Sequence, residues 1–216
     1  SGDTAPDTMI GGRGDDDYSV NVVGDVVIEY AGEGWDKASV GIASYTLPDN
    51  VEEMAMGFRA GAGTAIGNAL DNVIRTNSEA NILDGRGGAD TMSGEGGNDL
   101  YIVDNAGDIV KEGTFGGAND RVMTSVSYAL AAGVQVELLA TTDTAGISAI
   151  NLTGNEFAQR IFGNAGVNRL TGEGGNDVIT GGDGSDAILG RDGADVIVGG
   201  LGADTLTGGA ANDAFD

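Results

Sequence analysis

The sequence contains no cysteine and no histidine, and these two absences remove whole classes of chemistry. Without cysteine there are no disulfide cross-links and no thiolate nucleophiles. Without histidine there can be no Ser-His-Asp triad, no Cys-His dyad and no HExxH metalloprotease helix. The usual zinc sites, which are built from these two side chains, are excluded as well. GxSxG is also missing, so we expect no enzyme active site and assign no catalytic residue.

Basic residues are scarce, because Lys and Arg total 10 against 34 Asp and Glu, giving a formal net charge of −24. A surface of this sign repels nucleic acid and anionic membranes, so we expect cations as natural partners and no nucleic acid. No apolar run reaches the roughly 18 residues of a transmembrane helix, which predicts no membrane span. No basic segment followed by an apolar core stands at the N-terminus, which predicts no signal peptide there.

Proline occurs only twice, whereas glycine occurs 40 times in 216 residues without the three-residue period of collagen. Instead, residues 172–216 consist of five nonapeptides of the form G-G-x-G-x-D-x-U-x, where U is a large apolar residue. Their sixth positions are Asp177, Asp186, Asp195, Asp204 and Asp213, and their eighth positions are Ile179, Ile188, Ile197, Leu206 and Phe215. A carboxylate and an apolar side chain repeated in step predict a solenoid with a thin apolar core.

Nonapeptides occur in three runs, at residues 2–19, 67–102 and 154–216, and two related inserts, at residues 20–66 and 103–153, separate them. Residues 15–29 match residues 98–112, so a longer repeat overlies the short one. The inserts contain short β-type runs punctuated by Gly, Asn and Asp, and they lack helical periodicity. We therefore predict one continuous all-β solenoid over residues 1–216, whose inserts form longer and less regular coils.

The repeat length predicts where the turns stack. A strand of about three residues buries one side chain before the next turn, so two nonapeptides form one coil and alternate copies lie above one another. Glycine at positions 1, 2 and 4 permits positive φ and can direct carbonyl oxygens toward one point, to which the Asp adds a carboxylate. Such an oxygen site favours Ca²⁺ over Mg²⁺ or Zn²⁺. The best pairs should be Asp177 with Asp195, Asp195 with Asp213, and Asp186 with Asp204.

The predicted ligands of several Ca²⁺ ions are the sixth-position side chains and the first and fourth glycines of the regular copies. They are Asp16, Asp90, Asp99, Asn168, Asp177, Asp186, Asp195, Asp204, Asp213, Gly172, Gly175, Gly181, Gly184, Gly190, Gly193, Gly199 and Gly202. Without metal, aligned carboxylates repel and the thin core buries little, so we expect the chain to be disordered until calcium binds.

Two groups of polar residues leave alternatives open. The leading copies of the second and third runs carry amides at position 6, namely Asn72, Asn81, Gln159 and Asn168, which predicts weaker sites, empty sites or an amide ladder. Acids that recur between the inserts could be further calcium ligands or solvated turn residues: Asp25 and Asp108, Glu29 and Glu112, Asp36 and Asp120.

The tandem nonapeptides resemble those of the RTX (repeats-in-toxin) family, also known as hemolysin-type calcium-binding repeats. This resemblance implies a right-handed parallel β-roll, Ca²⁺ in the turns, and export by type I secretion from bacteria, with folding outside the cell. Ala5, Pro6 and Ala211 depart from the pattern, which weakens Asp7 and Asp213 as ligands. The sequence stops within a coil, so we expect either a fragment of a larger protein or a piece whose ends pair with something else.

Two functions fit this resemblance. One is a structural segment of a secreted adhesin, surface layer or filament, which the duplicated inserts favour; the other is a non-catalytic secretion and folding module of an exported enzyme or toxin.

Val178, Val196 and Val198 should face outward, either as an ordinary exposed sheet or as a contact face for self-association or neighbouring segments. Tyr45 and Tyr128 recur between the inserts, as core residues or as a sugar platform.

Overall fold

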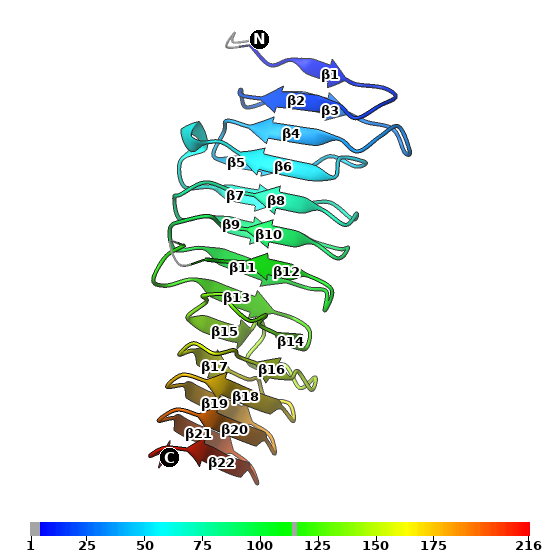
Figure 1. Cartoon of the computed structure of the whole chain (residues 1–216). Coiled ribbons are helices and arrows are strands. Elements are labelled where there is room, and N and C mark those ends of the chain that lie inside the picture. The colour runs from blue at the N-terminus through cyan, green and yellow to red at the C-terminus, as the bar shows by residue number, and fades with distance from the viewer. Residues whose placement is uncertain (1–4, 114–115) are drawn as a thin grey trace. The chain divides into compact units, whose positions relative to one another are not determined.

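The computed structural model describes residues 5–113 and 116–216, and in both ranges the chain forms short parallel β-strands (Figure 1). The described residues include one 3-10 turn, Phe58–Ala60, and no α-helix. None of them therefore lies in a helix long and apolar enough to cross a membrane. The predicted all-β class is confirmed. The chain divides into two compact units, residues 1–111 with 115–117 and residues 112–114 with 118–216. A single continuous solenoid remains a prediction.

In the first unit, consecutive strands along most of the chain go to different sheets, so that each coil adds one strand to each sheet. The six-stranded sheet contains β2 (Asp17–Val20), β4 (Lys37–Val40), β6 (Glu53–Met56), β8 (Val73–Arg75), β10 (Thr91–Ser93) and β12 (Ile109–Lys111). A second row contains β5 (Ser44–Thr46), β7 (Thr64–Ile66), β9 (Ile82–Asp84) and β11 (Leu100–Val103), and β1 (Thr8–Ile10) pairs with β3 (Val26–Ile28).

The second unit repeats this plan with two rows of parallel strands. One row contains β13 (Arg121–Thr124), β15 (Leu138–Thr141), β17 (Arg160–Phe162), β19 (Val178–Asp183), β21 (Val196–Leu201) and β23 (Ala214–Phe215). The other contains β14 (Tyr128–Ala129), β16 (Leu152–Thr153), β18 (Arg169–Gly174), β20 (Ala187–Asp192) and β22 (Thr205–Ala210). The parallel β-solenoid expected from the repeats is therefore present in both units.

Strand register confirms that two nonapeptides form one coil. In β19 and β21, Val178 pairs with Val196, which is 18 residues further along the chain. The inserts keep the same parallel pairing with coils of other lengths: Asp17 pairs with Lys37 in the first insert, and Tyr128 pairs with Leu152 in the second. The prediction that the inserts continue the solenoid as longer, irregular coils is thus correct within each unit.

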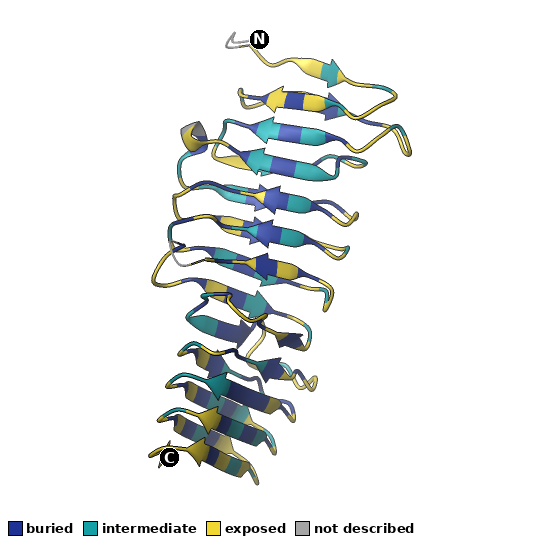
Figure 2. Ribbon diagram, viewed as in Figure 1, coloured by how far each residue is buried: buried dark blue, intermediate teal, exposed yellow. Residues whose placement is uncertain are grey.

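In the three-residue strands one side chain enters the core, whereas four-residue strands such as β4 and β6 bury two. The eighth-position residues Ile179, Ile188 and Ile197 are completely buried, and in Figure 2 such residues form dark blue segments within the strands. In the first unit the completely buried residues at this position include Ile74, Leu83 and Met92. Leu206 is half-buried and Phe215 is 54% exposed, because the last coils have fewer neighbours to cover them. Tyr128 is buried and Tyr45 half-buried, which favours core packing over a sugar platform.

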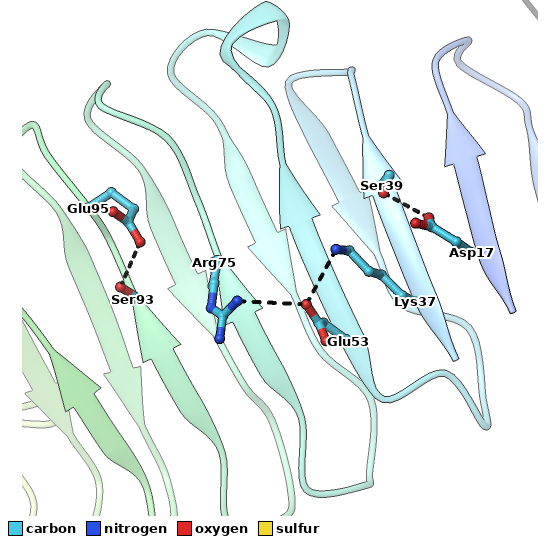
Figure 3. Close-up of polar contacts among 7 residues, drawn as sticks. All are labelled: Asp17, Lys37, Ser39, Glu53, Arg75, Ser93 and Glu95. Atoms are coloured by element: carbon cyan, nitrogen blue, oxygen red, sulfur yellow. Dashed lines mark hydrogen bonds and ion pairs between the residues drawn. The ribbon is translucent and has the colours of Figure 1, made fainter. Parts of the chain in front are cut away.

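The outward faces of the sheets differ between the units. On the first unit, Glu53 of β6 lies between Lys37 of β4, at 3.6 Å, and Arg75 of β8, at 4.0 Å (Figure 3). Exposed pairs of this kind contribute only about 0–1 kcal/mol each. On the second unit, Val178 and Val196 face outward, as predicted, and are 36% and 41% exposed. Their role as a contact face stays a prediction.

Two adjacent residues of β21 give a matched test of this core. Ile197→Ala removes a fully buried side chain from the single-residue stack, and we expect a loss of about 2–5 kcal/mol in the free energy of unfolding in calcium. Val196→Lys changes the exposed face of the same strand and should leave that free energy nearly unchanged. Chemical denaturation followed by circular dichroism measures both. Equal effects would contradict the one-residue core.

Candidate metal sites in the turns

We call the turns with Asp at position 6 the acidic turns; in the second unit they span residues 172–177, 181–186, 190–195, 199–204 and 208–213. Their backbone has positive φ at positions 2 and 4, as in Glu173 (76°) and Gly175 (91°). The expected positive φ at position 1 is wrong. Gly172 is required there for space, because a Cβ atom on it would lie 2.2 Å from Oδ2 of Asp177.

Each Asp of an acidic turn is fixed to the preceding coil through one of its two carboxylate oxygens. The peptide N–H of Asp177 donates to Oδ1 of Asp195 at 2.9 Å, and that of Asp195 donates to Oδ1 of Asp213 at 3.1 Å. On the other row, the N–H of Asp186 donates to Oδ1 of Asp204 at 2.9 Å. The three Asp pairs singled out from the sequence therefore do lie in directly stacked turns.

In several of these aspartates the second carboxylate oxygen has no hydrogen-bond partner. Oδ2 of Asp177, Asp186, Asp195 and, in the first unit, Asp90 is buried without a hydrogen bond. A Cβ placed on Gly181 would lie 2.3 Å from Oδ2 of Asp186 and 2.4 Å from the carbonyl oxygen of Gly199, so oxygen atoms line this glycine cradle. Buried polar atoms are nearly always satisfied in native proteins. An unpaired anionic oxygen beside main-chain carbonyls fits a hard cation such as Ca²⁺.

The electrostatics of these turns lead to the same conclusion. Burial, with carboxylates in neighbouring turns as a smaller cause, raises the pKa of Asp177 and of Asp90 from the usual 3.8 to about 7. Burial likewise raises the pKa of Asp186, with Asp204 as an added cause. Within the described ranges, the ion pairs are Lys37–Glu53, Arg75–Glu53 and Arg191–Glu173, and none neutralises a turn Asp. For Asp90, Asp177 and Asp186, the compensating charge would come from a bound proton or from a cation.

The remaining predicted residues occupy equivalent places. In the first unit, Oδ1 of Asp90 and of Asp99 accepts the N–H of Asn72 and of Asn81, both at 2.7 Å. Asp204 and Asp213 are half-buried. The fourth-position glycines of the acidic turns stack closely: a Cβ on Gly202 would lie 1.4 Å from the carbonyl oxygen of Gly184. The predicted set is thus brought together turn by turn, and ligation by these residues remains a prediction.

The leading turns of the second and third runs are built differently. We call residues 67–72, 76–81, 154–159 and 163–168 the amide turns, because Asn at position 2 accompanies Asn or Gln at position 6. In one of them, Nδ2 of Asn155 donates to the carbonyl oxygens of Ala131 at 2.9 Å and Val134 at 2.7 Å. Its Oδ1 accepts Nε2 of Gln159 at 2.7 Å. The side-chain amide of Asn155 thus provides the hydrogen-bond donors that these carbonyl oxygens need.

The other amide turns repeat this arrangement. Asn68 donates to the carbonyl oxygens of Pro48 and Val51, both at 2.7 Å, and Asn164 donates to that of Ser148 at 2.9 Å. Sequence reasoning noticed the sixth-position amides but missed the second-position asparagines, which the recurring Gly-Asn or Thr-Asn pair at the start of each copy could have indicated. The amide of Asn168 is already hydrogen-bonded at both oxygen and nitrogen, so the structure adds no argument for it as a metal ligand.

The recurring insert acids separate into two groups. Asp25 and Asp108 close local turns: Oδ2 of Asp25 accepts the N–H of Asn21 and Val22, each at 3.0 Å. Oδ2 of Asp108 accepts the N–H of Asp104 and Asn105, each at 3.2 Å. The other recurring acids, Glu29, Asp36, Glu112 and Asp120, are buried, as Asp108 is too, whereas Asp25 is half-buried. The interpretation as solvated turn residues is therefore wrong for Asp108 and for these four acids.

Comparison with known proteins agrees with this geometry. The family model for the RTX calcium-binding nonapeptide repeat matches four segments, residues 1–21, 66–101, 153–188 and 189–216, which together exceed half of the chain. Endo-1,3-1,4-beta-glycanase ExsH of Rhizobium meliloti (strain 1021) is 46% identical over 72 residues. That match covers 33% of this chain and only 15% of the enzyme, so the chain spans a small part of that relative.

Replacing Asn155 tests whether the amide turns are stabilised by hydrogen bonds rather than by calcium. Asn155→Ala leaves the carbonyl oxygens of Val134 and Ala131 without their donor, and the bond to Val134 is buried, so we expect a loss of about 1–3 kcal/mol in unfolding free energy. The number of calcium ions bound per chain should stay the same. Denaturation and a count of bound ions test this, with exposed Asn21→Ala as the control. Fewer bound ions in Asn155→Ala would contradict an amide-filled turn.

The pKa values of Asp90 and Asp177 give the metal-free protein a characteristic pH dependence. Because burial raises their pKa from 3.8 to about 7, their contribution to stability is fully present below 3.8 and is lost as pH rises through about 7. The metal-free chain should therefore show more β-structure at about pH 4 than at about pH 8. Calcium competes with protons for these carboxylates. The calcium concentration that folds half of the chain should therefore decrease as the pH rises from about 4 to about 8. Circular dichroism checks both, and a pH-independent midpoint would contradict buried acidic ligands.

Proposed function

Because the chain belongs to the RTX calcium-binding nonapeptide repeat family, we propose that its acidic turns bind several Ca²⁺ ions and that this binding folds the solenoid. The observation that carries this proposal is the buried, unpartnered Oδ2 atom repeated in Asp90, Asp177, Asp186 and Asp195. An oxygen-only turn with a carboxylate on either side is suited to Ca²⁺, which accepts six to eight oxygen ligands in flexible geometry.

The ions would lie between stacked turns. In the second unit, Asp177 with Asp195, and Asp195 with Asp213, would serve one row, and Asp186 with Asp204 the other. Main-chain carbonyls of the glycine-rich turns would complete the ligand shells. Mg²⁺ fits poorly, because it requires a tight octahedron and gives up water reluctantly.

Folding should depend on the metal because the chain has little else to hold it together. Each regular strand buries one residue, and a net charge of −24 opposes compaction. The amide turns need no cation, and they stand at the start of the second and third runs. We propose that they form first and that calcium then extends the solenoid into the acidic turns, where binding free energy becomes folding free energy.

The chain is proposed to act in a larger secreted bacterial protein, folding where extracellular calcium is available. The duplicated inserts and the absence of catalytic signatures in the sequence favour a structural role, as in an adhesin, surface layer or filament. A second candidate is a non-catalytic module of an exported enzyme, which the partial match to a glycanase favours. The complete coding sequence distinguishes them: a catalytic domain supports the module, and further insert-bearing units support the structural role.

A calcium titration tests the proposed folding. Far-UV circular dichroism should show coil in chelator and β-structure at about 0.1–1 mM Ca²⁺, and the same concentration of Mg²⁺ should fail. Replacing both Asp186 and Asp195 with Ala should raise the calcium midpoint by about three- to tenfold, since each belongs to a carboxylate pair. A fully ordered chain after exhaustive dialysis against chelator, with no metal bound, would refute the proposal.

The control removes the same charge from the same turns. Asp183 and Asp192 are exposed and lie three residues before Asp186 and Asp195. Their double replacement with Ala should leave the calcium midpoint within about twofold of the unmodified chain, since exposed charges act weakly. An equal shift in both double variants would mean that total charge, rather than the paired carboxylates, sets calcium affinity.

A further inference from the structure

The first insert contributes to an acidic cluster whose composition differs from the acidic turns. One carboxylate oxygen from each of Asp16, Glu29 and Asp36, which we call the insert cluster, lies within 4.8 Å of the others. All three residues belong to the first unit. Glu29 and Asp36 are only 6% and 1% exposed, and Asp16 is half-buried. Three carboxylates this close and this buried repel one another strongly unless a cation lies among them.

The solenoid explains how these residues meet. Asp36 stacks on Asp16 as one acidic-turn Asp stacks on another: the N–H of Asp16 donates to Oδ1 of Asp36 at 2.9 Å, across 20 residues. Glu29 follows β3 and stands 18 residues after Gly11, in the register of a first-position glycine. It therefore adds a side-chain carboxylate where an acidic turn offers only its main chain.

Two further observations indicate that the insert cluster is prepared for a ligand. Oδ2 of Asp36 is buried and has no hydrogen-bond partner, and Oδ2 of Asp16 has none either. The hydroxyl of Tyr18 donates to Oε2 of Glu29 and so holds this carboxylate in place. A Cβ on Gly11 would lie 2.4 Å from Oδ2 of Asp16 and 2.2 Å from the Tyr18 hydroxyl, so glycine keeps the space open.

We propose that Asp16, Glu29 and Asp36 form a separate divalent-cation site, with Tyr18 as the residue that positions Glu29. The oxygen ligands select Ca²⁺, and trivalent lanthanide ions would replace it. With three carboxylates against two in an acidic-turn pair, this site should bind Ca²⁺ more tightly and fill first. It would hold the first insert to the coil before it, whatever the occupancy of the acidic turns.

The sequence repeats the same residue types around the second insert: Asp99 and Tyr101 precede it, and Glu112 and Asp120 lie within it. Recurrence of all four types at matching positions indicates that they are retained as one set. Isolated surface acids would have no reason to keep a tyrosine and a glutamate at fixed positions beside them.

The one tryptophan of the chain, Trp35, directly precedes Asp36 and provides a local reporter. We would titrate the full chain, held in calcium, with Tb³⁺ and record terbium emission sensitised by selective excitation of tryptophan. Emission should rise and saturate. Glu29→Gln, which keeps the side chain's size, should weaken this binding by at least about tenfold. Glu79 is exposed, so Glu79→Gln is the control, and this variant should change the terbium affinity by less than about twofold.

The outcomes separate this site from the acidic turns. Unchanged Trp-sensitised terbium affinity in a folded Glu29→Gln chain would overturn the proposal. If circular dichroism shows that this variant does not fold, Asp36→Asn is titrated in its place and judged by the same criterion. The Asp186→Ala, Asp195→Ala double variant should keep the tryptophan-sensitised signal. If that signal persists in a chain whose folding proves independent of calcium, the proposed function fails while the insert site stands.

Discussion

The stack of turns depends on how each sixth-position carboxylate divides its two oxygens. One oxygen accepts the peptide N–H of the residue one coil earlier, as Asp195 does for Asp177, and so sets the spacing of the coils. In Asp90, Asp177, Asp186 and Asp195, the other oxygen is buried beside a first-position glycine and has no hydrogen-bond partner. A neutral amide can supply the first contact, but only an anion creates the demand for a cation at the second. The repeat therefore joins stacking geometry and metal binding in one side chain.

The two kinds of turn solve the same problem with opposite chemistry. Carbonyl oxygens that converge in a turn need a positive partner, and in the amide turns Asn68 and Asn155 supply N–H groups to them. In the acidic turns of the second unit that position carries Gly, Glu or Arg, and in the proposed function a metal ion supplies the positive partner. Placing amide turns before acidic turns would give the second and third runs a start that is independent of calcium and a continuation that requires it. This order suits a chain that must fold in one direction from a marginal nucleus.

Much of this could be read from the sequence, since strict periodicity fixes the parallel coil, the stack of Ile179, Ile188 and Ile197, and the pairing of Asp177 with Asp195. Three features could not. Gly172 is required because a carboxylate oxygen occupies the place of a Cβ atom, and not because its φ is positive. The repeat pattern of the sequence cannot distinguish these two causes. The bonds made by Asn155 reach carbonyls more than 20 residues away, inside an aperiodic insert. The meeting of Glu29 with Asp16 and Asp36 requires knowing that a 20-residue coil keeps the register of an 18-residue one.

A solenoid of this kind should bind its ions neither independently nor all at once. Asp195 would belong to two successive sites, because it stacks below Asp177 and above Asp213. An ion in one site orders the carboxylate and glycine turn needed by the next, which favours the second ion. It also neutralises part of the shared charge, which disfavours that ion. Since an unfolded chain must lose far more backbone entropy per site than one shared charge contributes, ordering should prevail. Binding would then spread along a row from neighbour to neighbour, and cooperativity would grow with the number of acidic turns in that row.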